Sequence, residues 1–152
     1  MKSKKTDCWG FSLMEMLAVI AIISVLMGMI LSGGNQAKQH ARIYKTKAMI
    51  ASLDTALALY HTDFGAYPGA GNQNLVNLLA DAATYSGNND WHGPYISFKK
   101  QDLNGVIPGA TVIDAWGYDY YYSLGTVPAY KIWSRGPDMQ NDNGMNDDLI
   151  SW

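Results

Sequence analysis

The C-terminal tail carries the densest group of residues that could do chemistry. Residues 138–148 contain four Asp and three Asn, with no Lys, Arg or His among them. Like charges this close repel one another unless a cation or water offsets the repulsion. Hard oxygen donors without Cys or His favour Ca²⁺ over zinc or copper. The tail is therefore a candidate calcium site, with a solvated acidic turn as the alternative.

A second candidate is Glu15, an acid one turn inside an apolar run. From residue 11 to residue 31, only Glu15 and two serines interrupt a run of Leu, Ile, Val, Ala, Met, Gly and Phe. At about 1.5 Å per residue the run matches a hydrocarbon core of about 30 Å, which predicts a transmembrane helix. An acid in such a helix is costly and calls for a partner. No base lies in the run, and the amine made by cutting between Gly10 and Phe11 is the candidate.

The charges ahead of the apolar run predict how the chain is oriented in a membrane. Three Lys and one Asp give residues 1–10 a charge of +2, which leaves −4 on the remainder of a chain with net charge −2. Because positive flanks stay in the cytoplasm, the C-terminal domain is expected to cross. The alternatives are an uncleaved signal anchor and a secretory signal cut after the run, at Ser32-Gly33-Gly34.

Composition excludes several other classes of protein. A net charge of −2 indicates no nucleic-acid interface. We find no pairing of a nucleophile with a base and no cofactor fingerprint, so an enzyme is not expected. Cys8 is the one cysteine and precedes the predicted cut, so no disulfide is expected in the exported domain.

Periodicity predicts one long helix. Apolar residues recur at spacings of three and four over residues 35–62, without a proline. This amphipathic stretch continues the membrane segment, residues 11–34, as one nearly continuous helix. Gly65 supplies a left-handed cap and Pro68 prevents the helix from resuming.

The remainder of the chain predicts a small sheet and hence an α+β fold. Residues 63–111 are expected to be a variable loop region with a short helix at 74–80. Within residues 112–152 the apolar period approaches two, which predicts aromatic-rich strands at 118–123 and 129–134. This antiparallel sheet is expected to pack on the exported half of the long helix.

The N-terminal pattern resembles the type III signal of type IV pilins and type II secretion pseudopilins. Basic residues precede Gly10-Phe11-Ser12-Leu13-Met14-Glu15, and the apolar run follows. The resemblance implies that a membrane-embedded prepilin peptidase removes residues 1–10 as a leader and N-methylates Phe11. It also implies that Glu15 pairs with a terminal amine during filament assembly.

Later motifs narrow the resemblance to major pseudopilins and imply the type IV pilin-like fold. The motifs stand in the family's order: Tyr60-His61-Thr62-Asp63-Phe64-Gly65-Ala66-Tyr67-Pro68 at the end of the long helix, Gly93-Pro94-Tyr95, and Asp114-Ala115-Trp116-Gly117-Tyr118. In the last motif, Ala115 replaces the proline of the family pattern.

The tail resembles the calcium loop of the same family. It departs from the family pattern at Pro137, Met139 and Asp147, and Asn-Asp-Asn replaces glycines, so which residues contact the ion stays open. The matching positions are Ser134, Gly136, Asp138, Asn146, Asp148 and Trp152. The resemblance implies a Ca²⁺ shell drawn from the following groups: Asp138, Asn141, Asn143, Asn146, Asp147, Asp148 and the backbone carbonyl of Arg135.

These resemblances lead us to expect a structural subunit of a type II secretion pseudopilus, processed at Gly10–Phe11 and polymerised into a helical filament that drives protein export. Expected partners are further copies, minor pseudopilins, the prepilin peptidase, the inner-membrane assembly platform and the membrane. The expected location is the bacterial inner membrane, single-pass, with a cytoplasmic N-terminus, a periplasmic C-terminal domain and a periplasmic filament. The alternatives are a type IV pilin for adhesion, motility or DNA uptake, and a membrane-anchored calcium-binding module that does not polymerise.

Overall fold

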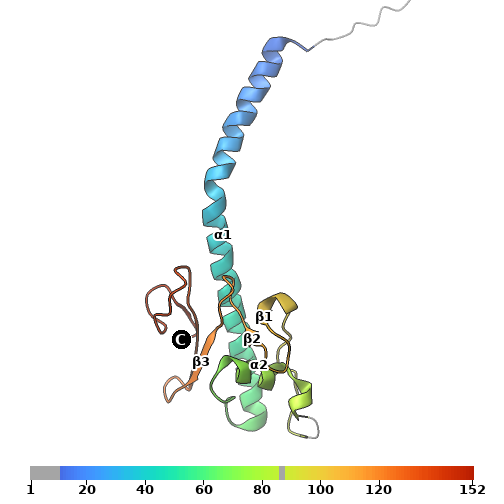
Figure 1. The fold of residues 1–152 in the computed structure, drawn as a ribbon, viewed down its shortest axis with the longest axis vertical. Helices are drawn as coiled ribbons and strands as arrows, with labels where there is room; N and C mark the ends of the chain where they lie inside the picture. Colours follow the sequence, from blue (N-terminus) through green and yellow to red (C-terminus); the bar gives the residue numbers. More distant parts are fainter. Residues whose placement is uncertain (1–10, 86–87) are drawn as a thin grey trace, which may run out of the picture. The chain divides into compact units, whose positions relative to one another are not determined.

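The longest element is α1, a helix of 52 residues that covers Leu13–Phe64 (Figure 1). The single helix predicted for residues 12–62 is therefore confirmed. Gly65 follows it with φ 66° and donates its N–H to the His61 carbonyl at 2.8 Å. This left-handed residue ends the helix as predicted, because glycine adopts positive φ without steric cost.

The computed structural model describes residues 11–85 and 88–152, without the side chains of residues 29–33. The predicted leader, residues 1–10, lies outside the described residues. Contacts divide the chain into two compact units, Met1–Lys38 and Gln39–Trp152.

In the first unit, every described side chain from Phe11 to Gly28 is exposed. The large apolar ones expose between 44 % and 84 % of their surface. Among the described residues, no helix combines the length and the apolar character needed to span a membrane. The transmembrane span predicted for residues 11–34 is thus not confirmed, and its side chains at 29–33 lie outside the described set.

In the second unit, α1 forms one wall of the hydrophobic core. Ile50, Leu53 and Leu57 are at most 4 % exposed. Their spacings of three and four place them on one helix face, because a turn contains 3.6 residues. The core residues that pack with them come from α2 (Asn72–Ala80), from the strands and from residues that directly precede a strand: Leu75, Val76, Leu79, Ala110, Val112, Tyr120, Tyr122 and Ile132.

The region predicted as a variable loop contains more regular structure than expected. Its short helix is confirmed as α2, which begins two residues earlier than predicted. Two 3₁₀ turns follow, η1 (Ala82–Tyr85) and η2 (Lys100–Asp102). A short antiparallel pair, β1 (Leu103–Asn104) and β2 (Thr111–Val112), was not predicted. Two-residue strands carry too few positions for a period to be read.

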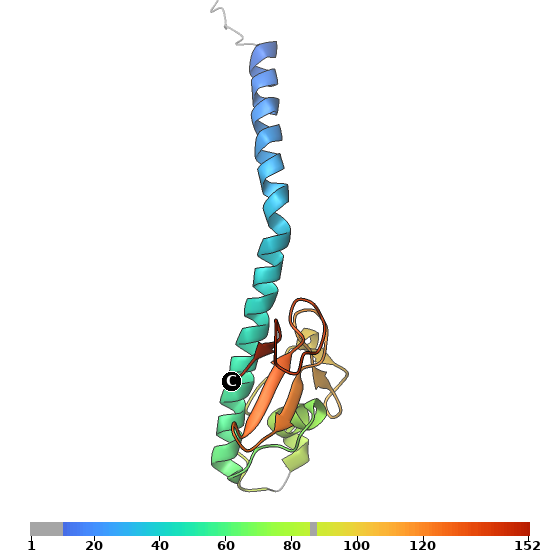
Figure 2. The same cartoon turned by 90° about the vertical axis from the view of Figure 1, so that its left-hand side faces the viewer.

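The main sheet is antiparallel, with strand order β3-β4-β5 (Figure 2). β3 (Tyr121–Leu124) pairs with β4 (Tyr130–Ser134), which confirms the predicted hairpin, and β5 (Leu149–Ile150) adds an unpredicted third strand. The first strand starts later than the predicted residue 118. Residues before Tyr121 are hydrogen-bonded elsewhere, since the N–H of Tyr120 reaches the Val112 carbonyl at 3.1 Å.

Asn72, the first residue of α2, joins that helix to the sheet. Its Nδ2 donates to the carbonyls of Val112 at 2.8 Å and Tyr120 at 2.9 Å. Its Oδ1 accepts the Val112 N–H at 2.9 Å. One side chain therefore satisfies three backbone groups between β2 and the segment that leads to β3.

Replacing Asn72 should weaken this joint. Asn72→Ala is expected to lower the free energy of unfolding by about 2–3 kcal/mol, because partly buried backbone groups lose their partners. Urea unfolding in mild detergent, followed by tryptophan fluorescence, measures this loss. Asn74→Ala is the matched control, because its exposed amide bonds only the Ala70 carbonyl, and it should cost under about 0.5 kcal/mol. If both variants lose the same free energy of unfolding, the role of Asn72 in joining α2 to the sheet would be contradicted.

Candidate metal site and assembly surfaces

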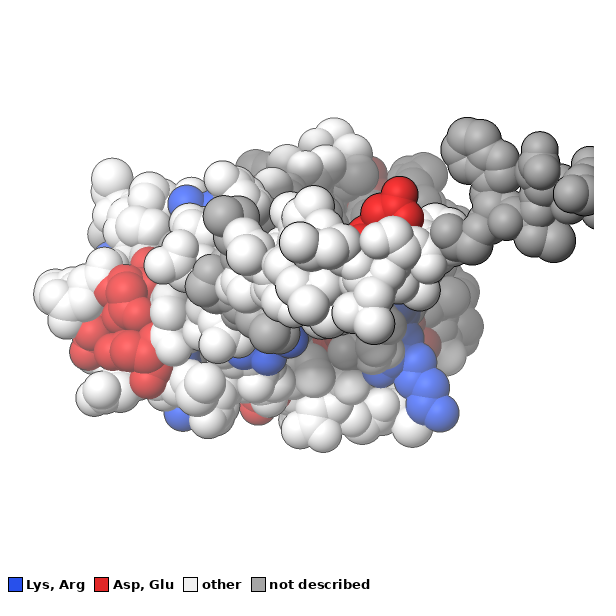
Figure 3. Space-filling view, turned by 90° about the horizontal axis from the view of Figure 1, so that it is seen from above, with Lys and Arg blue, Asp and Glu red and all other residues white. Residues whose placement is uncertain are grey.

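Three carboxylates converge in the tail. One oxygen from each of Asp138, Asp142 and Asp147 lies within 4.8 Å of the others. Figure 3 shows acidic side chains gathered at its left-hand edge, the side on which Figure 1 places the C-terminal loop. Asp138 is exposed, while Asp142 and Asp147 are half-buried.

The spacing of these oxygens fits Ca²⁺. Ca–O distances of about 2.3–2.6 Å let two ligand oxygens lie up to about 5 Å apart across the ion. All three donors are hard oxygens. Among the described residues, the ion pairs join Lys45 to Asp102 and His92 to Asp63, so none neutralises the cluster. The donor set therefore fits a hard divalent cation.

Two glycines allow the tail to fold back on itself. Gly136, with φ 69°, lies against the backbone carbonyl of Asp147, and a Cβ at this position would collide with that oxygen. Gly144, with φ 81°, lies against the Trp152 ring in the same way. Both conformations favour glycine, and both contacts leave no room for a side chain.

Asp148 organises the acidic loop from within. It is 8 % exposed, and its Oδ2 accepts the N–H groups of Asp142 at 3.0 Å and Gly144 at 2.7 Å. Its Oδ1 is buried and has no hydrogen-bond partner within residues 11–85 and 88–152. An unpaired buried carboxylate oxygen is costly, and a cation in the loop is a partner that would offset this cost.

Two of the three predicted amide ligands, Asn141 and Asn146, make side-chain hydrogen bonds within the protein. Asn141 Oδ1 accepts the Trp133 Nε1–H at 2.9 Å and the Asn143 N–H at 3.1 Å. The Nδ2 of Asn146 donates to Asp142 Oδ2 at 2.6 Å. In this conformation, therefore, these two amides shape the loop.

The structure brings together two of the predicted acids and a third that was not predicted. Asp138 and Asp147 were predicted and do converge, but Asp142 was left out of the predicted set although it stands in the same acidic run. The family pattern offered only glycines there. Arg135, predicted to contribute its carbonyl, directs its guanidinium to Tyr121 Oη at 2.8 Å.

A buried carboxylate anchors the start of the tail loop. Asp114, 4 % exposed, accepts the N–H groups of Trp116 and Tyr118 on Oδ1, both at 2.9 Å. Its Oδ2 accepts the Ser134 hydroxyl at 2.6 Å, and Ser134 Oγ in turn accepts the Gly136 N–H at 3.3 Å. The last residue of β4 is thereby fixed at the point where the loop begins.

Glu15 caps the start of α1. Its Oε2 accepts the Ser12 N–H at 2.9 Å, while Ser12 Oγ accepts the Met14 N–H at 3.2 Å. This pair is a variant of the capping box, because Ser12 Oγ accepts the N–H of the second helical residue instead of the third. It satisfies free N–H groups of the first turn. The Ser-x-x-Glu spacing signals such a cap, and the sequence reasoning did not use it. Phe11 is 77 % exposed, and Gly10 lies outside the described residues.

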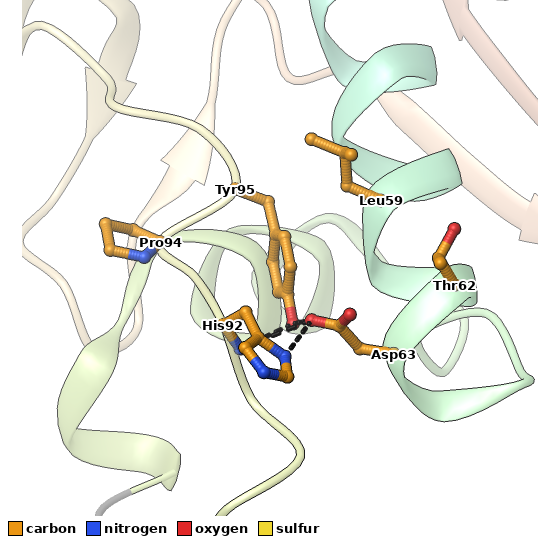
Figure 4. Close-up of a pocket in the computed structure, with 6 residues that line it drawn as sticks. All are labelled: Leu59, Thr62, Asp63, His92, Pro94 and Tyr95. Carbon is orange, nitrogen blue, oxygen red and sulfur yellow. Dashed lines mark hydrogen bonds and ion pairs between the residues drawn. The ribbon is translucent and has the colours of Figure 1, made fainter.

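Two motifs recognised in the sequence meet at the end of α1. Tyr95 donates its hydroxyl to Asp63 Oδ2 at 2.5 Å, and the same oxygen accepts the His92 N–H at 3.2 Å (Figure 4). His92 Nδ1 also lies 3.2 Å from it. This clasp fastens the segment around residues 92–95 to the last turn of α1.

The clasp shifts the ionisation of both partners. The hydrogen bond from Tyr95, followed by the bonds from His92, lowers the pKa of Asp63 below its usual 3.8. Burial, together with the carboxylate of Asp63, raises the pKa of Tyr95 to about 12. Asp63 is therefore ionised and Tyr95 is protonated at neutral pH.

Comparison with known proteins gives a consistent family match. The model of the family described as type II secretion system (T2SS), protein G, matches residues 35–152. Type II secretion system core protein G of Escherichia coli K12 is 32 % identical over 145 residues, 94 % of this chain and 90 % of the relative. The protein of that name from Klebsiella pneumoniae is 32 % identical over 146 residues, which cover 94 % of this chain and 93 % of the relative. No solved structure matches.

The lowered pKa of Asp63 predicts a pH-dependent stability difference. An ionised Asp63 stabilises the fold above the unfolded-state pKa of 3.8, and this contribution disappears as the pH falls through the lower folded-state value. Asp63→Asn should therefore have a lower free energy of unfolding than the wild type. This difference should be largest at neutral pH and should become smaller below pH 3.8. Urea unfolding from pH 3 to pH 7 tests this. Asp90→Asn, at an exposed acid, is the control; a gap for Asp63→Asn that is constant with pH would contradict the assignment.

Proposed function

The chain belongs to the type II secretion system protein G family, and from this premise we propose how it is processed, anchored and polymerised. It is a structural subunit of the type II secretion pseudopilus. A prepilin peptidase removes residues 1–10 and methylates the new terminal residue, Phe11. The subunit waits in the inner membrane with its C-terminal domain in the periplasm and then joins a helical filament that drives protein export. Its work is structural and not catalytic.

The observation that carries this proposal is the exposed apolar surface at the start of α1. Large apolar side chains surround the helix from Phe11 to Met27 and are all at least 44 % exposed. A helix that is apolar all round is stable only when it is covered, by lipid or by other helices. Lipid would cover it before assembly and the same segment of neighbouring copies afterwards.

The capping box suggests how Glu15 is kept ready for assembly. Its carboxylate lies at the N-terminus of α1, where it accepts the N–H of Ser12, the residue after Phe11, and where the helix dipole favours negative charge. A cut after Gly10 would create an amine at this same end. In an apolar filament core an unpaired acid is penalised, so each correctly placed amine of a neighbour would lower the energy of Glu15.

We also propose that the tail binds Ca²⁺ through Asp138, Asp142 and Asp147. The buried, unpaired Oδ1 of Asp148 in the same loop supports the proposal. Bound Ca²⁺ would supply charge neutralisation to a loop that, over residues 138–148, has four acids and no basic side chain. After removal of the leader the chain would contain no cysteine, so a cation is the available cross-link between the two ends of the acidic loop.

The remaining partners follow from the same proposal. They are other copies of the chain, minor pseudopilins and an inner-membrane assembly platform. The family match disfavours a type IV pilin and a module that never polymerises, because the curated relatives share the type II secretion name over 94 % of this chain.

Assembly should depend on Glu15. We expect Glu15→Ala to be inserted and processed normally but to give few filaments, because the apolar core then lacks the acid that pairs with the terminal amine. Shearing followed by immunoblotting measures filaments, and a mobility shift measures processing. Ser24→Ala, which removes another polar side chain of the same segment, is the control and should assemble normally. Wild-type filament yield from Glu15→Ala would refute the proposed pairing.

Calcium binding should be saturable and stabilising. Calorimetric titration of Ca²⁺ into the chelator-treated full chain in mild detergent is expected to show one site and a raised Tm, since a ligand that binds only the folded state stabilises it. Asp142→Asn should weaken binding roughly tenfold or more, because the loop loses one of its charged ligands. Asp90→Asn, outside the loop, should leave it unchanged. If the wild type shows neither a heat of Ca²⁺ binding nor a rise in Tm, the proposed site is refuted.

A further inference from the structure

A half-open pocket of about 210 Å³ lies beside the clasp at the end of α1. Leu59, Thr62 and Asp63 contribute from the helix, and His92, Pro94 and Tyr95 from the facing segment (Figure 4). Leu59 is 50 % exposed although it is apolar. The pocket therefore presents apolar walls around a single carboxylate.

One oxygen of that carboxylate is available. The hydrogen bonds that reach Asp63 from the described residues all use Oδ2. Figure 4 shows the other oxygen turned away from His92 and Tyr95, toward the side of Thr62 and Leu59. Because the clasp fixes the carboxylate and keeps it ionised, Oδ1 is a preorganised acceptor for a cation.

The chemistry of the pocket suits a guanidinium group. An aliphatic stem can pack on Leu59 and Pro94, while the planar head donates to the free oxygen and stacks on a neighbouring ring. Arginine is more weakly hydrated than lysine and loses less on entering such a site. The charge of the ligand would complement that of Asp63.

The described chain contains two arginines, and one of them is engaged. Arg135 donates to Tyr121 Oη and lies over the Tyr118 ring at 4.9 Å. Arg42 is exposed on α1 and takes part in none of the ion pairs found within residues 11–85 and 88–152. It is therefore the arginine with a free head group.

Arg42 cannot reach the pocket of its own chain. It lies 21 positions before Asp63 on the same helix, which is about 31 Å along the axis. A contact between them must join two copies. A subunit that forms an open filament needs two different, complementary surface patches. Arg42 and the anionic pocket at Asp63 are such a pair, because they lie at different positions along α1.

We propose that the pocket formed by Leu59, Thr62, Asp63, His92, Pro94 and Tyr95 receives the Arg42 side chain of another copy in the filament. The proposal rests on the proposed filament function. It sets an axial offset of about 31 Å between the two copies in contact. The pocket is thus an assembly contact in the periplasmic domain, separate from the apolar segment and from Glu15.

Cysteine cross-linking in assembled filaments tests the contact. The full chain carries Arg42→Cys and Thr62→Cys on a Cys8→Ser background, so that the introduced pair supplies all the thiols. Thr62 is exposed at the pocket, and its hydroxyl only bonds the Ala58 carbonyl of the same helix. Ser52→Cys is the matched control partner for Arg42→Cys, because Ser52 is also exposed on α1 and bonds Ala48 in the same way.

Arg42→Cys also removes the proposed ion pair and should lower the filament yield, so equal amounts of recovered filament are compared. On oxidation, the 42/62 pair should give a ladder of dimers and larger species in these filaments. The 42/52 pair should give little cross-linked product. Adding Glu15→Ala to the 42/62 pair should abolish both the filaments and the ladder. Filaments without a 42/62 ladder, or equal ladders from both pairs, would overturn the proposal. Failure of the wild type to form filaments would instead overturn the proposed function, and this inference with it.

Neutralising Arg42 provides a second measurement that needs no cysteine. Arg42→Gln should lower the yield of sheared filaments roughly tenfold, as expected for loss of a charge-assisted hydrogen bond at each contact. Lys47→Gln removes the same charge from another exposed position of α1 and should leave the yield near that of wild type. Equal yields from the two variants would contradict a specific role for Arg42.

Discussion

The folded domain depends on the buried carboxylate of Asp114. This group accepts two backbone N–H groups from the turn before β3 and the hydroxyl of Ser134 at the end of β4. The next residue, Ala115, donates its N–H to Thr46 Oγ1 on α1 at 3.3 Å. A buried charge is tolerable only when it is so fully hydrogen-bonded. Asp114 and its neighbour Ala115 therefore link the helix, the hairpin and the start of the acidic loop to one another.

Aromatic side chains hold the other side of that loop. Tyr121 stacks on Trp133 with ring centroids 5.1 Å apart, and Trp152 meets Trp133 edge to face at 6.2 Å. Lys131 lies 4.8 Å above the Trp152 ring, and Trp133 donates to Asn141 within the loop. These contacts hold the strands and the C-terminal residue next to the acidic loop. Asp138, Asp142 and Asp147 face one another although their charges repel.

The chain divides its tasks between separate parts of its length. The first part of α1 exposes apolar side chains on all sides and has one acid, which is committed to the helix start. The second unit has its own core and carries the acidic loop, the clasp at Asp63 and the exposed Arg42. In the proposed filament, apolar contact supplies most of the cohesion, while the charged contacts define the register between copies.

The sequence by itself determined the long helix, the α+β class, the hairpin, the acidic run and the family resemblance, which the comparisons confirm. Each of these depends on residues close together in the chain, where periodicity and local motifs report the conformation directly. Only the tertiary structure showed that Asp142 belongs to the acidic cluster and that Asn141 is held by Trp133. It alone brought Tyr95 onto Asp63, 32 positions away, because such pairings depend on how distant segments pack.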